Sequence, residues 1–203
     1  MSTQETLNDF GYVATVINGR DPKDLSIFNP VFANKARDPL FKEILDSFAP
    51  NPVTVFQIGA TETLKIAYRI GSGWSELFWG EYVNMYGGSI TVADINMDHI
   101  AHSSFLASNL KYPVQYLFGD GGELIKEGYD IYYLDGADIS QVPDAHIQTL
   151  NQFKAIEHTD SVVLVDDAPT KAEELIKYLE EKDISYKRYE FGNGMLKIDL
   201  RKV

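Results

Sequence analysis

Carboxylate side chains follow several short apolar runs of this sequence, each at the point where the run ends. Asp94 follows SITVA, Asp120 follows VQYLFG and Asp135 follows YDIYYL. Two adjacent acids, Asp166 and Asp167, follow SVVLV. Runs of this length that are rich in β-branched and aromatic residues are typical of buried strands. Because the carboxyl ends of parallel strands meet at one edge of a sheet, we expect these acids to share that edge.

Asp135, Asp166 and Asp167 together indicate a metal site. Three carboxylates at one edge repel one another and raise each other's pKa unless a cation neutralises them. Such oxygen ligands favour Mg²⁺ or another hard divalent cation, with water completing its coordination shell. The alternative is that Asp166 or Asp167 caps the helix that Pro169 opens, which would leave the other acid as surface charge.

Asp94 and Asp120 fit contacts with a nucleoside. An acid at the end of the second strand commonly accepts hydrogen bonds from a ribose diol, and Gly59 stands at the end of the first strand, VTVFQI. Asp120, in the sequence GDGG, could accept a hydrogen bond from an adenine amino group. The alternative for both acids is that they cap the helices that follow them.

These acids must be positioned by alternating strands and helices. The strand-like runs VTVFQIG, SITVADI, VQYLFGD, YDIYYLDG and SVVLVDD are separated by helical patterns, and two further strands surround Gly-Asn-Gly at 192–194. Strands separated by helices indicate βαβ units. We therefore predict an α/β fold: a Rossmann-like, doubly wound, mostly parallel seven-stranded sheet with helices on both faces and a C-terminal antiparallel β-hairpin.

Composition narrows the class of partner. The chain has 203 residues, a net charge of −12 and 44% hydrophobic residues. The acidity and the scattered basic residues argue against a nucleic-acid partner. No apolar run approaches the roughly 18 residues that span a bilayer, and no signal peptide is visible. The absence of cysteine excludes thiolate chemistry. We expect a cytoplasmic protein with neither a nucleic-acid nor a membrane partner.

The chain resembles the class I S-adenosylmethionine-dependent methyltransferases. Within that class it is most similar to the metal-dependent O-methyltransferases of the catechol and caffeoyl-CoA type and to their cephalosporin-hydroxylase-like and macrolide-sugar relatives. The matching pieces are VFQIGA, GWSELFWGEYV, ITVADIN, FGDGGELI, YDIYYLDGA, SVVLVDD and the closing hairpin. The resemblance implies a cofactor-binding methyltransferase-like domain over residues 51–203, preceded by an N-terminal arm and cap helix over residues 1–50.

The glycine loop of those families reads roughly Gly-Ala-x-x-Gly-Tyr-Ser, followed directly by a helix. Here it is divided into two halves, with TETLKIAYRIGS largely inserted between them. The alternative is that the second half is an ordinary turn with a tryptophan that anchors a core. The resemblance implies that S-adenosylmethionine is bound by Gly59, Ala60, Ser72, Gly73, Trp74, Ser75, Asp94, Ile95, Asp120, Gly121 and Asp135.

The resemblance also implies a reaction. Asp135 would be the first ligand of a magnesium ion, with Asp166 and Asp167 as the other two, and the metal would assist O-methylation of a small molecule. The catechol-type enzymes carry a lysine three positions after the first ligand, and macrolide-sugar relatives carry a histidine. Asp138 stands at that position here, so Asp138 or His146 is the candidate general base. A homodimer is possible.

Three other readings stay open. The chain could be a non-catalytic protein that keeps the fold and binds a ligand. It could be a methyltransferase-like enzyme with metal-free chemistry on a sugar or small metabolite. An NAD-dependent oxidoreductase would need Gly-x-Gly-x-x-Gly after the first strand, and GATETL lacks the later glycines.

Overall fold

The computed structural model describes residues 38–62, 75–136, 142–190 and 194–201. The chain divides into two compact units. The sheet unit comprises Val53–Gly59, Ser89–Ile95 and Gln115–Val203, and the helical unit comprises Met1–Pro52, Ala60–Gly88 and Asn96–Val114. Residues 1–37 lie outside the described residues, so the arm and cap helix expected over residues 1–50 stay a prediction.

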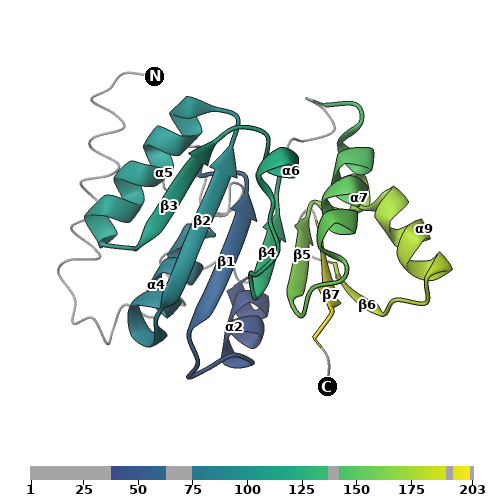
Figure 1. Cartoon of the computed structure of the whole chain (residues 1–203), viewed down its shortest axis with the longest axis horizontal. Coiled ribbons are helices and arrows are strands. Elements are labelled where there is room, and N and C mark those ends of the chain that lie inside the picture. The colour runs from purple at the N-terminus through teal and green to yellow at the C-terminus, as the bar shows by residue number, and fades with distance from the viewer. Residues whose placement is uncertain (1–37, 63–74, 137–141, 191–193, 202–203) are drawn as a thin grey trace. The chain divides into compact units, whose positions relative to one another are not determined.

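The sheet unit is built on seven strands in the order β3-β2-β1-β4-β5-β7-β6 (Figure 1). β4 pairs in parallel with β1 and with β5, whereas β7 is antiparallel to β5 and to β6. The predicted Rossmann-like α/β sheet with a closing antiparallel hairpin is therefore confirmed. The strands are β1 (Val53–Ile58), β2 (Gly88–Asp94), β3 (Val114–Phe118), β4 (Ile131–Leu134), β5 (Val162–Asp166), β6 (Tyr186–Tyr189) and β7 (Met195–Asp199).

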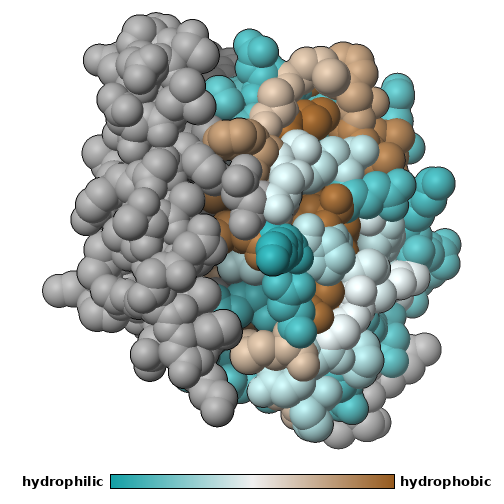
Figure 2. Space-filling model, turned by 90° about the vertical axis from the view of Figure 1, so that its left-hand side faces the viewer, coloured by the Kyte–Doolittle hydropathy of each residue, from teal (hydrophilic) through white to brown (hydrophobic). Residues whose placement is uncertain are grey.

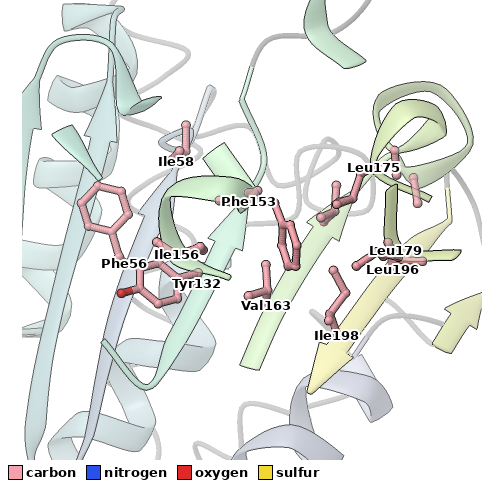
Figure 3. Close-up of a cluster of buried hydrophobic side chains, with 14 of the residues drawn as sticks. Phe56, Ile58, Tyr132, Phe153, Ile156, Val163, Leu175, Leu179, Leu196 and Ile198 are labelled. Atoms are coloured by element: carbon pink, nitrogen blue, oxygen red, sulfur yellow. The ribbon is translucent and has the colours of Figure 1, made fainter. Parts of the chain in front are cut away.

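The central strands β4 and β5 are buried along their whole length. Parallel strands covered on both faces read as continuous apolar runs, as IYYL and VVLV do here. The helices of this unit are α6 (Gly121–Leu124), α7 (Ala145–Ile156), α8 (Ala168–Lys171) and α9 (Glu173–Glu181). Helices α7 and α9 pack on the strands through a shared core (Figure 3), which includes Tyr132, Phe153, Ile156, Val163, Leu175, Leu179, Leu196 and Ile198.

The helical unit contains α2 (Asp38–Asp46), α4 (Glu76–Tyr86) and α5 (Met97–Leu110). Aromatic rings join α2 to α4: Phe41 stacks on Phe78, and its ring edge meets Trp79, with 4.8 Å between ring centroids in both pairs. All three rings are fully buried. Offset and edge-on aromatic pairs add to the stabilisation that burial provides. This cluster is therefore the core of the helical unit.

Large hydrophobic side chains also reach the surface. Figure 2 shows hydrophobic residues interspersed with hydrophilic ones on the described part of one face. Scattered exposure of this kind is normal for a folded chain. None of the helices that the structure describes has the length and apolar character needed to cross a membrane. The exposed large hydrophobics are Met85, Tyr86, Ile95, Met97, Phe105, Phe118 and Ile147.

Two isoleucines of α7 test the packing of this helix on the sheet. Ile156 is fully buried, whereas Ile147 is 40% exposed. Ile156→Ala should lower the free energy of unfolding by about 2–5 kcal/mol, because it leaves a cavity in the core. Ile147→Ala makes the same chemical change on the same helix and should cost no more than about 0.5 kcal/mol. Urea unfolding followed by circular dichroism measures both, and equal losses would contradict the packing of α7.

Candidate functional site

Backbone hydrogen bonds align the carboxyl ends of neighbouring strands in the sheet unit. The N–H of Gly59 donates to the carbonyl of Ala93 at 2.9 Å, which joins the end of β1 to the end of β2. The N–H of Asp135 donates to the carbonyl of Ile58 at 3.0 Å, which joins the end of β4 to β1. The predicted convergence of strand ends at one edge is therefore present.

Glycine is required at two positions of this edge. Gly59 has φ +93°, and a Cβ added there would lie 2.1 Å from the carbonyl oxygen of Asp135. A Cβ on Gly121 would lie 2.5 Å from a methyl carbon of Ile58. Both distances are far below van der Waals contact. The close packing of the ends of β1 and β4 accounts for Gly59, and the packing of α6 on Ile58 accounts for Gly121, whether or not a ligand is bound.

Asp94 ends β2 beside the end of β3, where the N–H of Gly119 donates to its backbone carbonyl at 3.0 Å. Asp94 is only 9% exposed, whereas Ile95, the next residue, is 64% exposed. The helix that follows is capped by Asn96, whose side chain accepts the N–H of Asp98 at 2.9 Å. Asp94 is therefore not the cap of that helix, which removes the capping alternative for this residue.

Asp120 caps the helix that follows it, which is the alternative that the sequence left open for this residue. It is the N-cap of α6, and its Oδ1 accepts the N–H of Gly122 at 2.7 Å. Capping thus accounts for one of its carboxylate oxygens. Gly121 begins the same short helix at the strand edge. The contact of Asp120 and Gly121 with an adenine ring stays a prediction.

In the helical unit, the first residue of the inserted segment, Thr61, is joined to the start of α4. Glu76, the first residue of α4, accepts hydrogen bonds from the N–H and the hydroxyl of Thr61 at 3.0 and 2.9 Å. The hydroxyl of Ser103 on α5 donates to the same carboxylate at 2.5 Å. Glu76 is only 2% exposed. A buried carboxylate needs such donors. This network therefore joins Thr61 to the first residue of α4 and to α5.

The hydrogen bonds between Thr61 and Glu76 lie next to both predicted halves of the glycine loop. Ala60 precedes Thr61, and Ser75 precedes Glu76, so the two predicted halves of the loop flank one hydrogen-bonded pair. Ser75 is the N-cap of α4 and is buried. Ser72, Gly73 and Trp74 lie outside the described residues. Their predicted contact with the cofactor stays a prediction, as do those of Ala60 and Ser75.

The cation at the acidic edge is a lysine. The Nζ of Lys171 lies 3.1 Å from Oδ1 of Asp135, 3.0 Å from Oδ2 of Asp167 and 2.9 Å from the carbonyl oxygen of Gly136. Its side chain is only 3% exposed. Burial by itself lowers the pKa of Lys171, but the carboxylates of Asp135 and Asp167 outweigh burial and raise the pKa above its ordinary value. The side chain is therefore an ammonium at neutral pH.

Asp166 is also held by donors of the protein. The hydroxyl of Tyr133 donates to its Oδ2 at 2.6 Å, and the N–H of Asp167 donates to its Oδ1 at 3.1 Å. The same hydroxyl is 3.5 Å from Oδ2 of Asp135. A phenol has one proton, so the short contact with Asp166 takes it. Tyr133 thus leaves Oδ2 of Asp135 with only a long, weak contact.

These contacts do not support the magnesium site predicted at Asp135, Asp166 and Asp167. An ammonium occupies the position between Asp135 and Asp167, and donors of the protein satisfy both oxygens of Asp166. No group of three or more histidine, cysteine, aspartate or glutamate side chains suited to hold a metal is found within the described residues. The sequence prediction considered only a metal ion as the neutralising cation. In the structure the ammonium of Lys171 is that cation.

The candidate general bases are not settled by the geometry. Asp138 lies outside the described residues. His146 lies in the first turn of α7, is partly exposed and interacts electrostatically with Glu174 on α9. Its role as a base stays a prediction.

A cavity of about 560 Å³ lies in the sheet unit between α8, α9 and the closing hairpin. Pro169, Ile176 and Met195 contribute apolar surface, and Glu173 and Arg188 contribute charge. Met195 is the register partner of Asp166. The cavity therefore adjoins the carboxyl end of β5, at the same edge of the sheet as the acids.

Sequence reasoning missed two residues, Lys171 in the sheet unit and Glu76 in the helical unit. Lys171 stands four positions after Asp167 in a segment expected to be helical, and this spacing brings opposite charges together on a helix. That spacing could have identified the ion pair. No comparable pattern points to Glu76, whose partners, Thr61 and Ser103, come from two separate segments.

The sequence matches no protein-family model and no curated protein. Solved structures do match. The chain is similar to magnesium protoporphyrin IX methyltransferase (ChlM) from Synechocystis PCC 6803 with bound S-adenosylmethionine (SAM), over 96% of this chain and 97% of that one, at 14% identity and a TM-score of 0.58. It is also similar to the methyltransferase PaMTH1 of Podospora anserina with bound SAH, over 80% and 76% of the two chains, at 14% identity and a TM-score of 0.52.

A third similar structure is the T. thermophilus 16S rRNA N2 G1207 methyltransferase RsmC, at 12% identity and a TM-score of 0.55. The match covers 83% of this chain but only 43% of RsmC. At these identities the likeness shows the fold alone. The fold is that of the class I SAM-dependent methyltransferases.

Gly59→Ala tests the close approach of β1 and β4. The alanine must adopt a positive φ, which costs roughly 1–2 kcal/mol, and its Cβ must displace the backbone of Asp135, which adds about 1–3 kcal/mol. Gly128 has a similar φ of +98° but no atom within 4 Å of an added Cβ. Gly128→Ala should therefore show the backbone cost alone. Urea unfolding measures both, and equal destabilisation would contradict the steric requirement at Gly59.

Proposed function

We propose that this protein is a SAM-dependent methyltransferase that acts on a small molecule. The observation that carries the proposal is the pairing of a nearly buried acid, Asp94, with an exposed isoleucine, Ile95, at the end of β2 and beside Gly59 at the end of β1. In open α/β sheets, ligands bind at the carboxyl ends of the strands. The cofactors in the ChlM and PaMTH1 structures, which share this fold, also support SAM as the ligand.

The residues at this edge fit such a cofactor. Asp94 would accept hydrogen bonds from the ribose hydroxyls, and Ile95 offers apolar surface to the adenine ring. When bound, SAM supplies a methyl group on a positively charged sulfur. The carboxylate of Asp94 makes the edge favourable for a cation, whereas that of Asp135 is already paired with Lys171. The protein contributes by holding both reactants in line and excluding water.

A small acceptor is supported by the charge of the chain and by the size of the cavity beside β5, although none of the strand-end acids lines this cavity. Its volume, about 560 Å³, falls in the range of roughly 300–1,000 Å³ found for small-molecule sites. RsmC shares the fold and acts on ribosomal RNA, but a net charge of −12 opposes binding of a phosphate backbone. We therefore favour a small molecule over RNA as the methyl acceptor.

Isothermal titration with SAM and with SAH tests the proposed function. The wild-type protein should bind both with roughly micromolar affinity. Asp94→Asn keeps the shape of the side chain but removes the charge that accepts the ribose hydrogen bonds. A hydrogen bond to a charged group contributes about 1.5–3 kcal/mol, so affinity should fall roughly 10- to 100-fold.

Asp98→Asn is the matched control, because Asp98 is an exposed acid in the first turn of α5 and the change in charge is the same. Its affinity for SAM should equal that of the wild type. Wild-type protein that binds neither ligand at millimolar concentration would refute the proposed function.

A further inference from the structure

The ammonium of Lys171 has as many oxygen atoms around it as it has N–H groups. A lysine ammonium has three N–H donors and no acceptor. Three oxygens surround it at 2.9–3.1 Å: Oδ1 of Asp135, Oδ2 of Asp167 and the carbonyl oxygen of Gly136. Asp135 and Gly136 accept hydrogen bonds from the ammonium, and Asp167 forms an ion pair with it. We call these three oxygens, with the ammonium they hold, the lysine cradle.

The distances in the lysine cradle are those of hydrogen bonds. Ionic N–H···O contacts are typically about 2.7–3.2 Å long. Magnesium–oxygen distances are close to 2.1 Å, and calcium–oxygen distances are about 2.3–2.6 Å. A divalent ion at the position of Nζ would require Asp135 and Asp167 to move inward and the ammonium to leave.

The fold also keeps the ammonium in place. Lys171 follows Asp167 by four residues, and its N–H donates to the carbonyl of Asp167 at 3.0 Å. The two residues therefore lie on one helical turn. Asp167 itself has φ 52° and ψ 38°, a left-handed conformation that aspartate tolerates better than most residues. The side chain of Lys171 is 97% removed from solvent, so its displacement would require α8 to open.

We propose that Lys171 is a built-in counter-cation that takes the place of a divalent metal ion between β4 and β5. Its ammonium neutralises Asp135 and Asp167 and fixes the orientation of the Asp135 carboxylate. Lys171 is thus a positioning residue, and the site operates without a metal.

The consequence for the acceptor rests on the proposed function. Lys171 holds Oδ1 of Asp135, and Tyr133 leaves Oδ2 with only a contact of 3.5 Å. Asp135 is 26% exposed, so Oδ2 can accept a hydrogen bond from a ligand. The acceptor is then a molecule with a hydroxyl or amine donor, and it does not have to chelate a divalent cation.

The experiment is a titration with Mn²⁺ and with Mg²⁺, followed by calorimetry and by thermal unfolding. Wild-type protein should show no saturable binding, and EDTA should leave its melting temperature unchanged. Lys171→Met removes the ammonium and leaves Asp135, Asp167 and the Gly136 carbonyl without a cation. This variant should gain saturable Mn²⁺ binding and a melting temperature that rises with Mn²⁺ concentration.

Lys177→Met is the matched control. Lys177 pairs with Glu173 and Glu174 on the exposed side of α9, so the same substitution should give no metal binding. The double variant Asp135→Asn/Lys171→Met should lose the binding that Lys171→Met gains. If Lys171→Met is unfolded without metal, refolding on addition of Mn²⁺ is the same supporting result, and if it stays unfolded, the wild-type titration decides.

Two results would overturn the proposal. One is saturable Mn²⁺ or Mg²⁺ binding by the wild type that Asp135→Asn abolishes. The other is a folded Lys171→Met variant that behaves like Lys177→Met. Neither measurement uses SAM, so failure of the lysine cradle is distinguishable from failure of the proposed function. Loss of SAM binding alone would leave the counter-cation in place.

Discussion

The parallel pairing of β1 with β4 is the constraint on which the rest of the sheet edge depends. Register Ile58↔Leu134 brings Gly59 directly beside Asp135. A Cβ at Gly59 would lie 2.1 Å from the Asp135 carbonyl oxygen, so only glycine permits this approach. Once the two strand ends meet, the β4–β5 pairing brings Asp166 and Asp167 to the same edge. Backbone hydrogen bonds between the strands therefore bring the carboxylates together. Their mutual repulsion must then be offset by other groups.

Side chains of the protein itself offset the repulsion between these carboxylates. Lys171 supplies one positive charge to two carboxylates, and Tyr133 supplies a hydroxyl proton to a third. Breaking a buried ion pair by removing one partner leaves an uncompensated charge, which is why such clusters tolerate little change. A metal-dependent site would instead leave the acids open for a cation from solution. The two arrangements use the same three aspartates, and the lysine decides between them.

The helical unit shows a related use of a buried carboxylate. Glu76 joins Thr61, which follows β1 in the sequence and begins the inserted segment, to Ser103 on α5. Loops tolerate insertion far better than cores do, because their ends alone must be positioned. If the glycine loop is divided as the resemblance implies, these hydrogen bonds hold Thr61 against the first residue of α4.

The alternation of apolar runs and helical patterns determined the fold class, because side-chain periodicity reports local structure directly. It also placed Asp94, Asp120 and Asp135 at strand ends and identified the closing hairpin. Only the tertiary structure decided what these acids do. Asp120 caps a helix and Asp94 does not, since Asn96 takes that role. Lys171 meets Asp135 across 36 positions of sequence because β4 and β5 are neighbours and α8 is packed beside them. Pairing over that distance depends on strand order and burial, neither of which a local pattern encodes.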